Sequence, residues 1–506
     1  MAGKATGYWW VSAAGALAVL SAVVVLALVR PWDPAGTVTP VAPTGSPEPE
    51  PVAVLSAAGA DAPVPTAEGV RAAIDDLVRG GVLGEAISVA IIDAVTGEEL
   101  YRHQPDRPTV PASTTKLVTA ATVLATRGPA YQLSTVAVAG AAPGEVVLVG
   151  GGDPTLAVDA DGFYPGAARL DRLAEQVREA LGDTPVERVT VDATRFTGPV
   201  HGPWTPDIPG SGFVGPITAL MTDGARVDPD PAQGQRSAAR WEAPDLAAGE
   251  AFAELLGVPA GSVSRGQAPA PAEPAGNGPT PTGPTPTGPA AGPTGPGPAR
   301  SGPPAGPPPG PPPPGTELGR VISPPVQRLV EFMLATSDNV VAEALARQVA
   351  LARGDPASFA GAGTAMAAVL DQLGVAVGGH RLADGSGLSR TNRLTAALLT
   401  DLLGSAATGP ERPHAGVFAA LPVAGWSGTL ADRFRTPQPR TGAGAGQVRA
   451  KTGSLNGVDA LAGVVTTADG RVLAFAVLAD AVPVDTSTAR AALDRIAATL
   501  AGCGCR

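Results

Sequence analysis

Lysine is nearly absent from this 506-residue sequence. Among its 35 basic residues only Lys4, Lys116 and Lys451 are lysines, and the others are arginines. Arginine keeps its proton in proteins, whereas lysine can lose it when its surroundings lower its pKa. Lys116 and Lys451, the two lysines outside the N-terminal tail, are therefore candidates for chemistry that needs a compact or deprotonatable amine.

Cysteine and histidine are almost as scarce. The two cysteines, Cys503 and Cys505, stand one residue apart near the C-terminus, which excludes a framework of disulfide bonds. The four histidines are scattered along the chain and form no pair with metal-ligand spacing. The sequence therefore gives no sign of a metal site.

The charge balance is acidic, and no basic stripe is visible. The formal net charge is −11. A protein that binds nucleic acid is expected to carry clustered Lys and Arg, so we expect no nucleic-acid partner. The hydrophobic fraction of 44% is typical of globular proteins and is sufficient for a sizeable core.

A membrane-length apolar segment lies near the N-terminus, where residues 8–29 contain no charged side chain. As a helix this segment extends roughly 33 Å, enough to cross the hydrocarbon core of a membrane. A cleavable signal peptide is the alternative, but its apolar core is shorter and is followed by small residues, whereas Arg30, Pro31 and Trp32 follow here. We therefore favour a single-pass transmembrane anchor within residues 1–30. The rest of the chain is then expected on the extracytoplasmic side of the cell membrane.

Two low-complexity tracts divide the remaining chain. Residues 31–66 are rich in Pro and Ala and indicate an extended tether. Residues 266–316 repeat Pro-Thr-Gly and end in a run of prolines, a composition that cannot bury enough apolar surface to fold. Because these two tracts are low in complexity, folded structure is expected over residues 67–265 and from 317 to about 502.

Hydrophobic patterns predict strands and helices on both sides of the second tract. Strands are expected over 86–94, 447–453, 457–467 and 471–480, and helices from Ser113 onward, over 166–181, over 326–334 and around Leu493–Leu500. Strands near both chain ends, with helices between them, indicate a mixed α/β domain whose sheet joins distant segments.

The most informative local motif is Ser113-Thr-Thr-Lys116. Residues three apart on a helix share one face, so the two functional side chains can touch. At the helix start, Ser113 also meets unpaired N–H groups and the positive end of the helix dipole. A neutral Lys116 can take the hydroxyl proton and so activate an otherwise poor nucleophile.

Two further motifs follow in order, Ser337-Asp338-Asn339 and Lys451-Thr452-Gly453. Together the three match the signature of the penicillin-recognising serine enzymes. Additional segments narrow the match: Val149–Leu156 (VGGGDPTL), Asp384–Arg390 (DGSGLSR), Leu421–Gly425 (LPVAG) and Gly428–Leu430 (GTL). With these segments the chain resembles the D-alanyl-D-alanine carboxypeptidase/endopeptidase family, the class C low-molecular-mass penicillin-binding proteins, over residues 70–260 and 317–500.

The resemblance implies a β-lactamase/DD-peptidase-like fold of the α/β (α+β) class, with an antiparallel sheet flanked by helices. In this family a smaller inserted domain interrupts the catalytic domain between the first two motifs. The catalytic domain is thus expected over residues 67–140 and 317–502, and the inserted domain over 141–265. Residues 266–316 then form a linker.

The resemblance also implies roles for individual residues. Catalysis would fall to Ser113 as the acylated nucleophile, Lys116 as its base and Ser337 as the proton relay. Substrate binding would fall to Asn339, Lys451, Thr452, Gly453 and Ser454, with the oxyanion held by the backbone N–H groups of Ser113 and Ser454. From its charge, Arg390 is a further candidate, since an anionic diaminopimelate side chain would bind a cation.

Other residues are expected to be structural. We expect Asp338 to be a solvent-facing loop residue, and Trp204 and Trp426 to pack the fold. The segments 150–156 and 384–387 are expected to be tight-turn scaffolding.

The resemblance therefore implies a serine-type D-Ala-D-Ala carboxypeptidase, and it leaves open an additional endopeptidase activity on cross-links. It would act on peptidoglycan stem peptides, be acylated by β-lactams, and need no cofactor. Two alternatives remain open: a β-lactamase on the same fold, and a non-catalytic wall-binding scaffold whose Pro-rich tracts carry the function.

Overall fold

A computed structural model describes residues 61–230, 237–270, 311–375, 378–407, 412–434 and 442–505. All of these belong to the compact unit Ser56–Arg506. The predicted membrane segment, residues 8–29, and most of the two Pro-rich tracts lie outside the described residues. Among the described helices, none is both long and apolar enough to cross a membrane.

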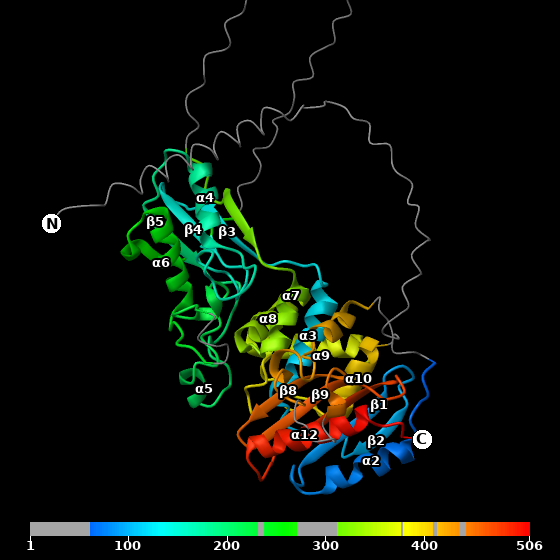
Figure 1. The fold of residues 1–506 in the computed structure, drawn as a ribbon. Helices are drawn as coiled ribbons and strands as arrows, with labels where there is room; N and C mark the ends of the chain where they lie inside the picture. The colour runs from blue at the N-terminus through cyan, green and yellow to red at the C-terminus, as the bar shows by residue number, and fades with distance from the viewer. Residues whose placement is uncertain are drawn as a thin grey trace, which may run out of the picture. The chain divides into compact units, whose positions relative to one another are not determined.

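The first sheet joins the two ends of the described chain (Figure 1). Its strand order is β2-β1-β10-β9-β8, and every neighbouring pair is antiparallel. The strands are β1 (Ile87–Asp93), β2 (Glu99–His103), β8 (Val448–Leu455), β9 (Val458–Thr466) and β10 (Val472–Ala479). In register, Ile87 faces Ala479, so the predicted union of distant segments in one sheet is confirmed.

Helices cover both faces of this sheet, which is why every residue of β1 is buried. Alternate residues of β1 point to opposite faces: Val89 and Ile91 join one core cluster, and Ala90 and Ile92 join the other. The first cluster is closed by α2 (Ala67–Arg79) and α12 (Thr486–Ala501). The second is closed by α3 (Thr115–Arg127), α7 (Val326–Thr336), α8 (Asn339–Arg353), α9 (Phe359–Gln372) and α10 (Ala396–Ala407).

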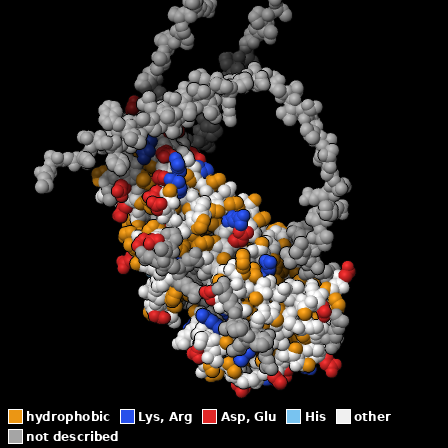
Figure 2. All heavy atoms as spheres, in the orientation of Figure 1, with side chains coloured by type: hydrophobic (Ala, Val, Ile, Leu, Met, Phe, Trp, Pro, Cys, Tyr) orange, Lys and Arg blue, Asp and Glu red, His pale blue; other side chains and the backbone are white. Residues whose placement is uncertain are grey.

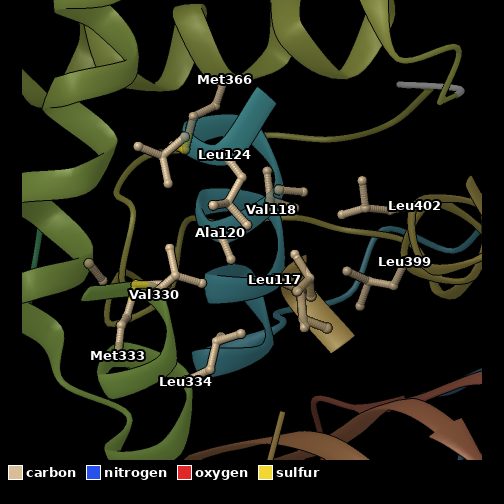
Figure 3. Close-up of a cluster of buried hydrophobic side chains, with 14 of the residues drawn as sticks. Leu117, Val118, Ala120, Leu124, Val330, Met333, Leu334, Met366, Leu399 and Leu402 are labelled. Carbon is tan, nitrogen blue, oxygen red and sulfur yellow. The ribbon is translucent and has the colours of Figure 1, made fainter. Parts of the chain in front are cut away.

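Helix α3 lies at the centre of the second cluster. Figure 3 shows Leu117, Val118 and Leu124 of α3 surrounded by side chains of its neighbours, among them Val330, Met333, Met366 and Leu399. Each fully buried side chain of this size contributes about 1.5–3 kcal/mol. The helix that starts beside Ser113 is therefore held rigidly.

The second sheet has the order β6-β5-β4-β3-β7 and is mixed. Its strands are β3 (Ser134–Ala139), β4 (Glu145–Val149), β5 (Arg188–Asp192), β6 (Val263–Arg265) and β7 (Glu317–Ile322). Helices α4 (Leu170–Leu181) and α6 (Pro244–Leu256) pack against it. Residues 134–139 and 317–322 were expected in the catalytic domain, but both strands pair within this second sheet. We call the second sheet with its helices and loops, residues 134–322, the inserted part.

The remaining described elements are short. They comprise helices α5 (Asp207–Gly210) and α11 (Val417–Ala420), and single 3-10 turns at Ala112–Thr114, Asp223–Ala225, Ala260–Ser262, Pro413–Gly416, Gly428–Leu430 and Gly442–Gly444. On the face drawn in Figure 2, acidic and basic side chains lie close together in several places.

Candidate active site

Ser113 and Lys116 are in contact, as the spacing predicts. Ser113 lies in the 3-10 turn Ala112–Thr114, directly before α3, and Lys116 lies in the first turn of α3. The Lys116 Nζ atom is 3.1 Å from Ser113 Oγ. Lys116 is fully buried, and this burial lowers its pKa to about 8 even though nearby carboxylates act in the opposite direction.

Lys116 has two further acceptors besides Ser113. Its Nζ donates to Asn339 Oδ1 and to the main-chain oxygen of Ser386, each at 2.7 Å. Neither of these oxygens can donate a proton. A neutral amine therefore uses its two N–H bonds on Asn339 and Ser386, and its lone pair is left facing the Ser113 hydroxyl. This is the geometry that a general base needs.

The Ser386 carbonyl is presented by a loop that two buried carboxylates hold. Glu343 accepts the N–H groups of Gly385, at 3.2 Å, and Ser386, at 2.9 Å. Asp384 accepts the N–H group of Gly387, at 2.7 Å. Burial and the neighbouring Asp384 raise the pKa of Glu343 to about 7. The predicted tight turn at 384–387 therefore also contacts Lys116 directly.

The Ser337-Asp338-Asn339 motif connects α7 to α8. Ser337 ends α7 in the left-handed region, with φ of 63°, a conformation that costs a non-glycine residue energy and is often found at functional sites. Asp338 caps α8 by accepting the N–H of Val341 at 3.0 Å. Asn339 joins the two sides of the site, since its Oδ1 receives Lys116 and its Nδ2 donates to the Phe213 carbonyl at 3.0 Å.

Asp338 is not solvent-facing, and that expectation was wrong. Asp338 is only 6% exposed and contacts the inserted part. Tyr164 donates its hydroxyl to Asp338 Oδ2 at 3.1 Å, and Arg226 forms a buried ion pair with the same oxygen at 3.5 Å. Burial alone would raise the pKa of Asp338, but the charges of Arg226 and Arg240 hold it below its usual value.

The third motif lies on β8, beside the turn that carries Ser113. Lys451 is fully buried and its Nζ donates to the Thr452 carbonyl at 2.9 Å. The hydroxyls of Thr452 and Thr429 are 3.0 Å apart. A side chain at Gly453 would place its Cβ 2.8 Å from the Pro111 oxygen and 3.2 Å from the Ser113 nitrogen. Glycine is therefore required for β8 to approach Ser113.

A pocket of about 370 Å³ opens beside Ser113. Predicted site residues on its wall are Ser113, Ser337, Asn339, Thr452 and Ser454. Lys116, Lys451 and Gly453 are not among the lining residues. Arg390 also lies outside the lining set, and its Nη2 donates to the main-chain oxygen of Asn456, which does line the pocket, at 2.6 Å.

Sequence reasoning missed much of the pocket wall. The inserted part supplies Ile208, Phe213 and Arg240, and the rest of the described chain supplies Thr336, Leu388, Thr429, Arg433, Leu455, Asn456 and Arg490. Thr429 and Leu388 lie within segments that already pointed to the family, which was a usable signal. The three arginines carry no local motif, so their positions depend on tertiary structure.

Trp204 and Trp426, the two tryptophans that were expected to pack the fold, differ in their surroundings. Trp204 packs edge-on against Phe359 and donates its Nε1–H to Asp384 Oδ2 at 2.9 Å. It thus packs the fold, as expected, and it also holds the loop that presents Ser386. Trp426 is 80% exposed, so the expectation that it packs the fold was wrong.

Comparisons with known proteins agree on one family. The chain matches the D-Ala-D-Ala carboxypeptidase 3 (S13) family over residues 70–257 and 310–500, and the gap between these ranges contains most of the second Pro-rich tract. It is similar to a carboxypeptidase of Mycobacterium tuberculosis, with 38% identity over 452 residues, covering 88% of this chain and 86% of the relative. It is also 38% identical to the carboxypeptidase DacB of Mycolicibacterium smegmatis over 480 residues, covering 94% and 92%.

The fold has a solved counterpart. Penicillin binding protein 4 of Haemophilus influenzae superposes with a TM-score of 0.62 at 21% identity, covering 84% of this chain and 98% of the other. That likeness supports the β-lactamase/DD-peptidase-like arrangement. With its ordered motifs, its two sheets and a family match that spans most of its length, the chain belongs to the D-Ala-D-Ala carboxypeptidase 3 (S13) family.

Proposed function

We propose that this protein removes the terminal D-Ala from peptidoglycan stem peptides through an acyl intermediate on Ser113. Membership of the D-Ala-D-Ala carboxypeptidase family supplies the reaction class. The observation that carries the assignment of residues is the contact set of Lys116, whose nitrogen meets Ser113 Oγ and two oxygens that only accept.

The lowered pKa of Lys116 is sufficient for this role. At pH 7, a pKa of about 8 leaves roughly a tenth of the molecules with a neutral amine. An unperturbed lysine would leave roughly one in 3,000 neutral. Burial thus raises the fraction of molecules with a neutral Lys116 at pH 7 by more than about two orders of magnitude.

In the acylation step, Ser113 Oγ attacks the carbonyl carbon between the last two D-Ala residues and its proton passes to Lys116. The tetrahedral oxyanion is held by the N–H groups of Ser113 and Ser454. When the C–N bond breaks, Ser337 relays the proton that Lys116 took up to the leaving amine, and Lys116 is neutral again. Water then hydrolyses the ester and restores the Ser113 hydroxyl.

The other motif residues bind the substrate. Asn339 has a second N–H bond beside the one that it gives to Phe213, and this bond is suited to a peptide carbonyl. Thr452 lines the pocket with a hydroxyl suited to the terminal carboxylate. Lys451 adds a buried positive charge, and Gly453 lets β8 approach Ser113. Arg390, at the pocket rim, would attract an anionic diaminopimelate side chain.

β-Lactams are proposed as covalent inhibitors and cross-linked peptides as additional substrates. A penicillin binding protein 4 structure from Haemophilus influenzae holds a β-lactam, with a TM-score of 0.58 at 20% identity. We also propose that residues 8–29 anchor the enzyme in the cell membrane with its catalytic part on the wall side. The charge-free length of this segment supports the anchor.

Labelling with a fluorescent penicillin tests the function directly. We expect a stable adduct in the wild type and none in Ser113→Ala, together with release of D-Ala from a D-Ala-D-Ala peptide by the wild type alone. Rapid turnover of penicillin would instead indicate a β-lactamase. A wild type that forms no adduct and releases no D-Ala would indicate a non-catalytic scaffold.

A further inference from the structure

A second cavity lies where the inserted part meets α9, and we call it the groove. Its volume is about 960 Å³, against about 370 Å³ for the pocket beside Ser113. Its lining comes from residues 198–203 of the inserted part, from 358–367 around the start of α9, and from 380–391. The Thr197 N–H donates to the Ala357 carbonyl at 3.0 Å and so joins the two sides. A cavity of this size is at the upper end of the range for ligand-binding clefts.

The walls of the groove are held tightly. A side chain at Gly363 of α9 would place its Cβ 2.2 Å from the Leu382 oxygen, so glycine is required for the loop to lie against the helix. Phe359, which lines the groove, packs edge-on against Trp204 with ring centroids 5.4 Å apart. The guanidinium of the buried Arg347 lies 4.0 Å from the centroid of the same ring. These contacts form without any ligand, so the shape of the groove is largely preformed.

The groove is mostly apolar and carries a cation. Pro199, Pro203 and Leu382 contribute apolar surface, and none of the described residues that line it is acidic, although the whole chain has a net charge of −11. Arg381 is exposed, and it bonds to other described residues only through its main chain, which pairs with Arg393. Its guanidinium is therefore available to a ligand. This surface suits a peptide with small apolar side chains and a free carboxylate.

The groove and the smaller pocket share a wall. Leu388 lines the pocket, and Thr391, three residues later, lines the groove. Between them, Ser389 Oγ donates to the Pro203 carbonyl at 2.9 Å and lies 2.8 Å from Thr391 Oγ1. Arg390 belongs to the same short stretch and is exposed. Arg390 therefore stands at the boundary between the two cavities.

We infer that the groove binds a second stem peptide, the one that is joined to the diaminopimelate residue of the stem being cleaved. This inference rests on the proposed function, in which Arg390 receives the diaminopimelate side chain. The amine at the end of that side chain is where a neighbouring stem is attached by an amide bond, and its carboxylate stays free for Arg390. The neighbouring stem then continues into the groove, where its methyl groups meet the apolar wall and a carboxylate meets Arg381. The cross-link stays intact, and the enzyme prefers stems that are already cross-linked in this way.

Release of D-Ala from two soluble peptides tests the inference. One is a single pentapeptide stem, and the other is the same pentapeptide carrying a tetrapeptide stem on its diaminopimelate amine. For the wild type we expect kcat/KM for D-Ala release to be at least about tenfold higher with the cross-linked peptide. In Arg381→Gln that value should fall roughly 10-fold, the usual effect of losing a charged hydrogen bond. The value for the single stem should change by less than about threefold.

A second variant blocks the groove by size instead of charge. Thr364 is exposed on α9 and lines the groove, so Thr364→Trp should bring kcat/KM for the cross-linked peptide down to that for the single stem. Thr364→Ser, which leaves the space open, is its control and should keep the preference. For Arg381→Gln the matched control is Arg188→Gln, an exposed arginine on β5 that does not line the groove and should change neither value.

Three results would overturn the inference. A wild type that treats both peptides alike, or a Thr364→Trp variant that keeps the preference, would mean that the second stem does not use the groove. A groove that binds only the glycan strand would give this outcome, since neither peptide carries sugar. An equal loss with both peptides in Arg381→Gln would mean a structural role. Failure of the proposed function looks different, because the wild type would then release no D-Ala from either peptide.

Discussion

The two five-stranded sheets of this protein contribute to the pocket in different ways. The antiparallel sheet carries the third motif on β8 and packs beside the turn that bears Ser113. Within the described residues, the strands of the mixed sheet carry no residue of the three motifs. Loops of the inserted part nevertheless reach the site through Tyr164, Phe213 and Arg226. The three motifs thus lie outside the inserted part, and the contacts that support the second motif come largely from the inserted part.

Replacing Lys116 should give the largest effect, because it removes the base itself. We expect Lys116→Arg to slow acylation by penicillin about 10²–10⁴-fold, since a guanidinium keeps its proton and cannot act as a general base. Stopped-flow measurement of adduct formation would check this. If the variant acylates at a rate near that of the wild type, Lys116 is not the general base.

The corresponding test of the inserted part is Arg226→Gln. This change removes the ion-pair partner of the buried Asp338 and leaves only the more indirect effect of Arg240, and breaking such a pair typically costs about 3–5 kcal/mol. We expect a lower free energy of unfolding and slower acylation, measured by denaturant titration and by penicillin labelling.

Arg172→Gln is the control for that experiment. It removes an exposed ion pair with Glu175 in the same inserted part, where about 0–1 kcal/mol is expected. If the two variants behaved alike, the contact between the inserted part and the second motif would have no energetic weight.

A smaller effect, on the pH dependence of acylation, is expected from Glu343→Gln, which lies outside the inserted part. Above its own pKa of about 7, Glu343 is negatively charged and raises the pKa of Lys116, so its removal lowers the pKa of Lys116 further. The acid limb of the acylation rate, which rises with pH as Lys116 loses its proton near pH 8, should therefore shift to lower pH. Glu331→Gln on α7, which removes a partly exposed carboxylate paired with Arg328, is the control and should leave the profile in place. An upward shift would contradict the proposed coupling.

The smallest effects separate the two tryptophans. Trp204→Phe takes a donor from Asp384 and should destabilise the protein by about 1 kcal/mol. Trp426→Phe alters an exposed side chain and should stay within about 0.5 kcal/mol of the wild type. Thermal unfolding of both variants would distinguish a partly buried, hydrogen-bonded side chain from an exposed one.

Local patterns in the sequence predicted strands β1, β8, β9 and β10 of the antiparallel sheet, helices α3, α4, α7 and α12, and the contact between Ser113 and Lys116. These features depend on periodicity and on spacing within one helix, which a sequence displays directly. Asp338 could not be placed in this way. Its burial depends on Tyr164 and Arg226, which are more than 100 residues away in the chain and carry no motif. Arg490 and Trp426 were missed for the same reason, since tertiary packing alone decides which side chains face a pocket or solvent.

The pairing of β1 with β10 also limits when the enzyme can become active. Residues 87–93 hydrogen-bond to residues 472–479, so the central strand pair forms only after nearly the whole chain has been synthesised. Contacts this distant in sequence are slow to form during folding. A nascent chain that already contains Ser113, Lys116 and Asn339 therefore still lacks the sheet that fixes them, and premature termination near the C-terminus yields a polypeptide without a working pocket.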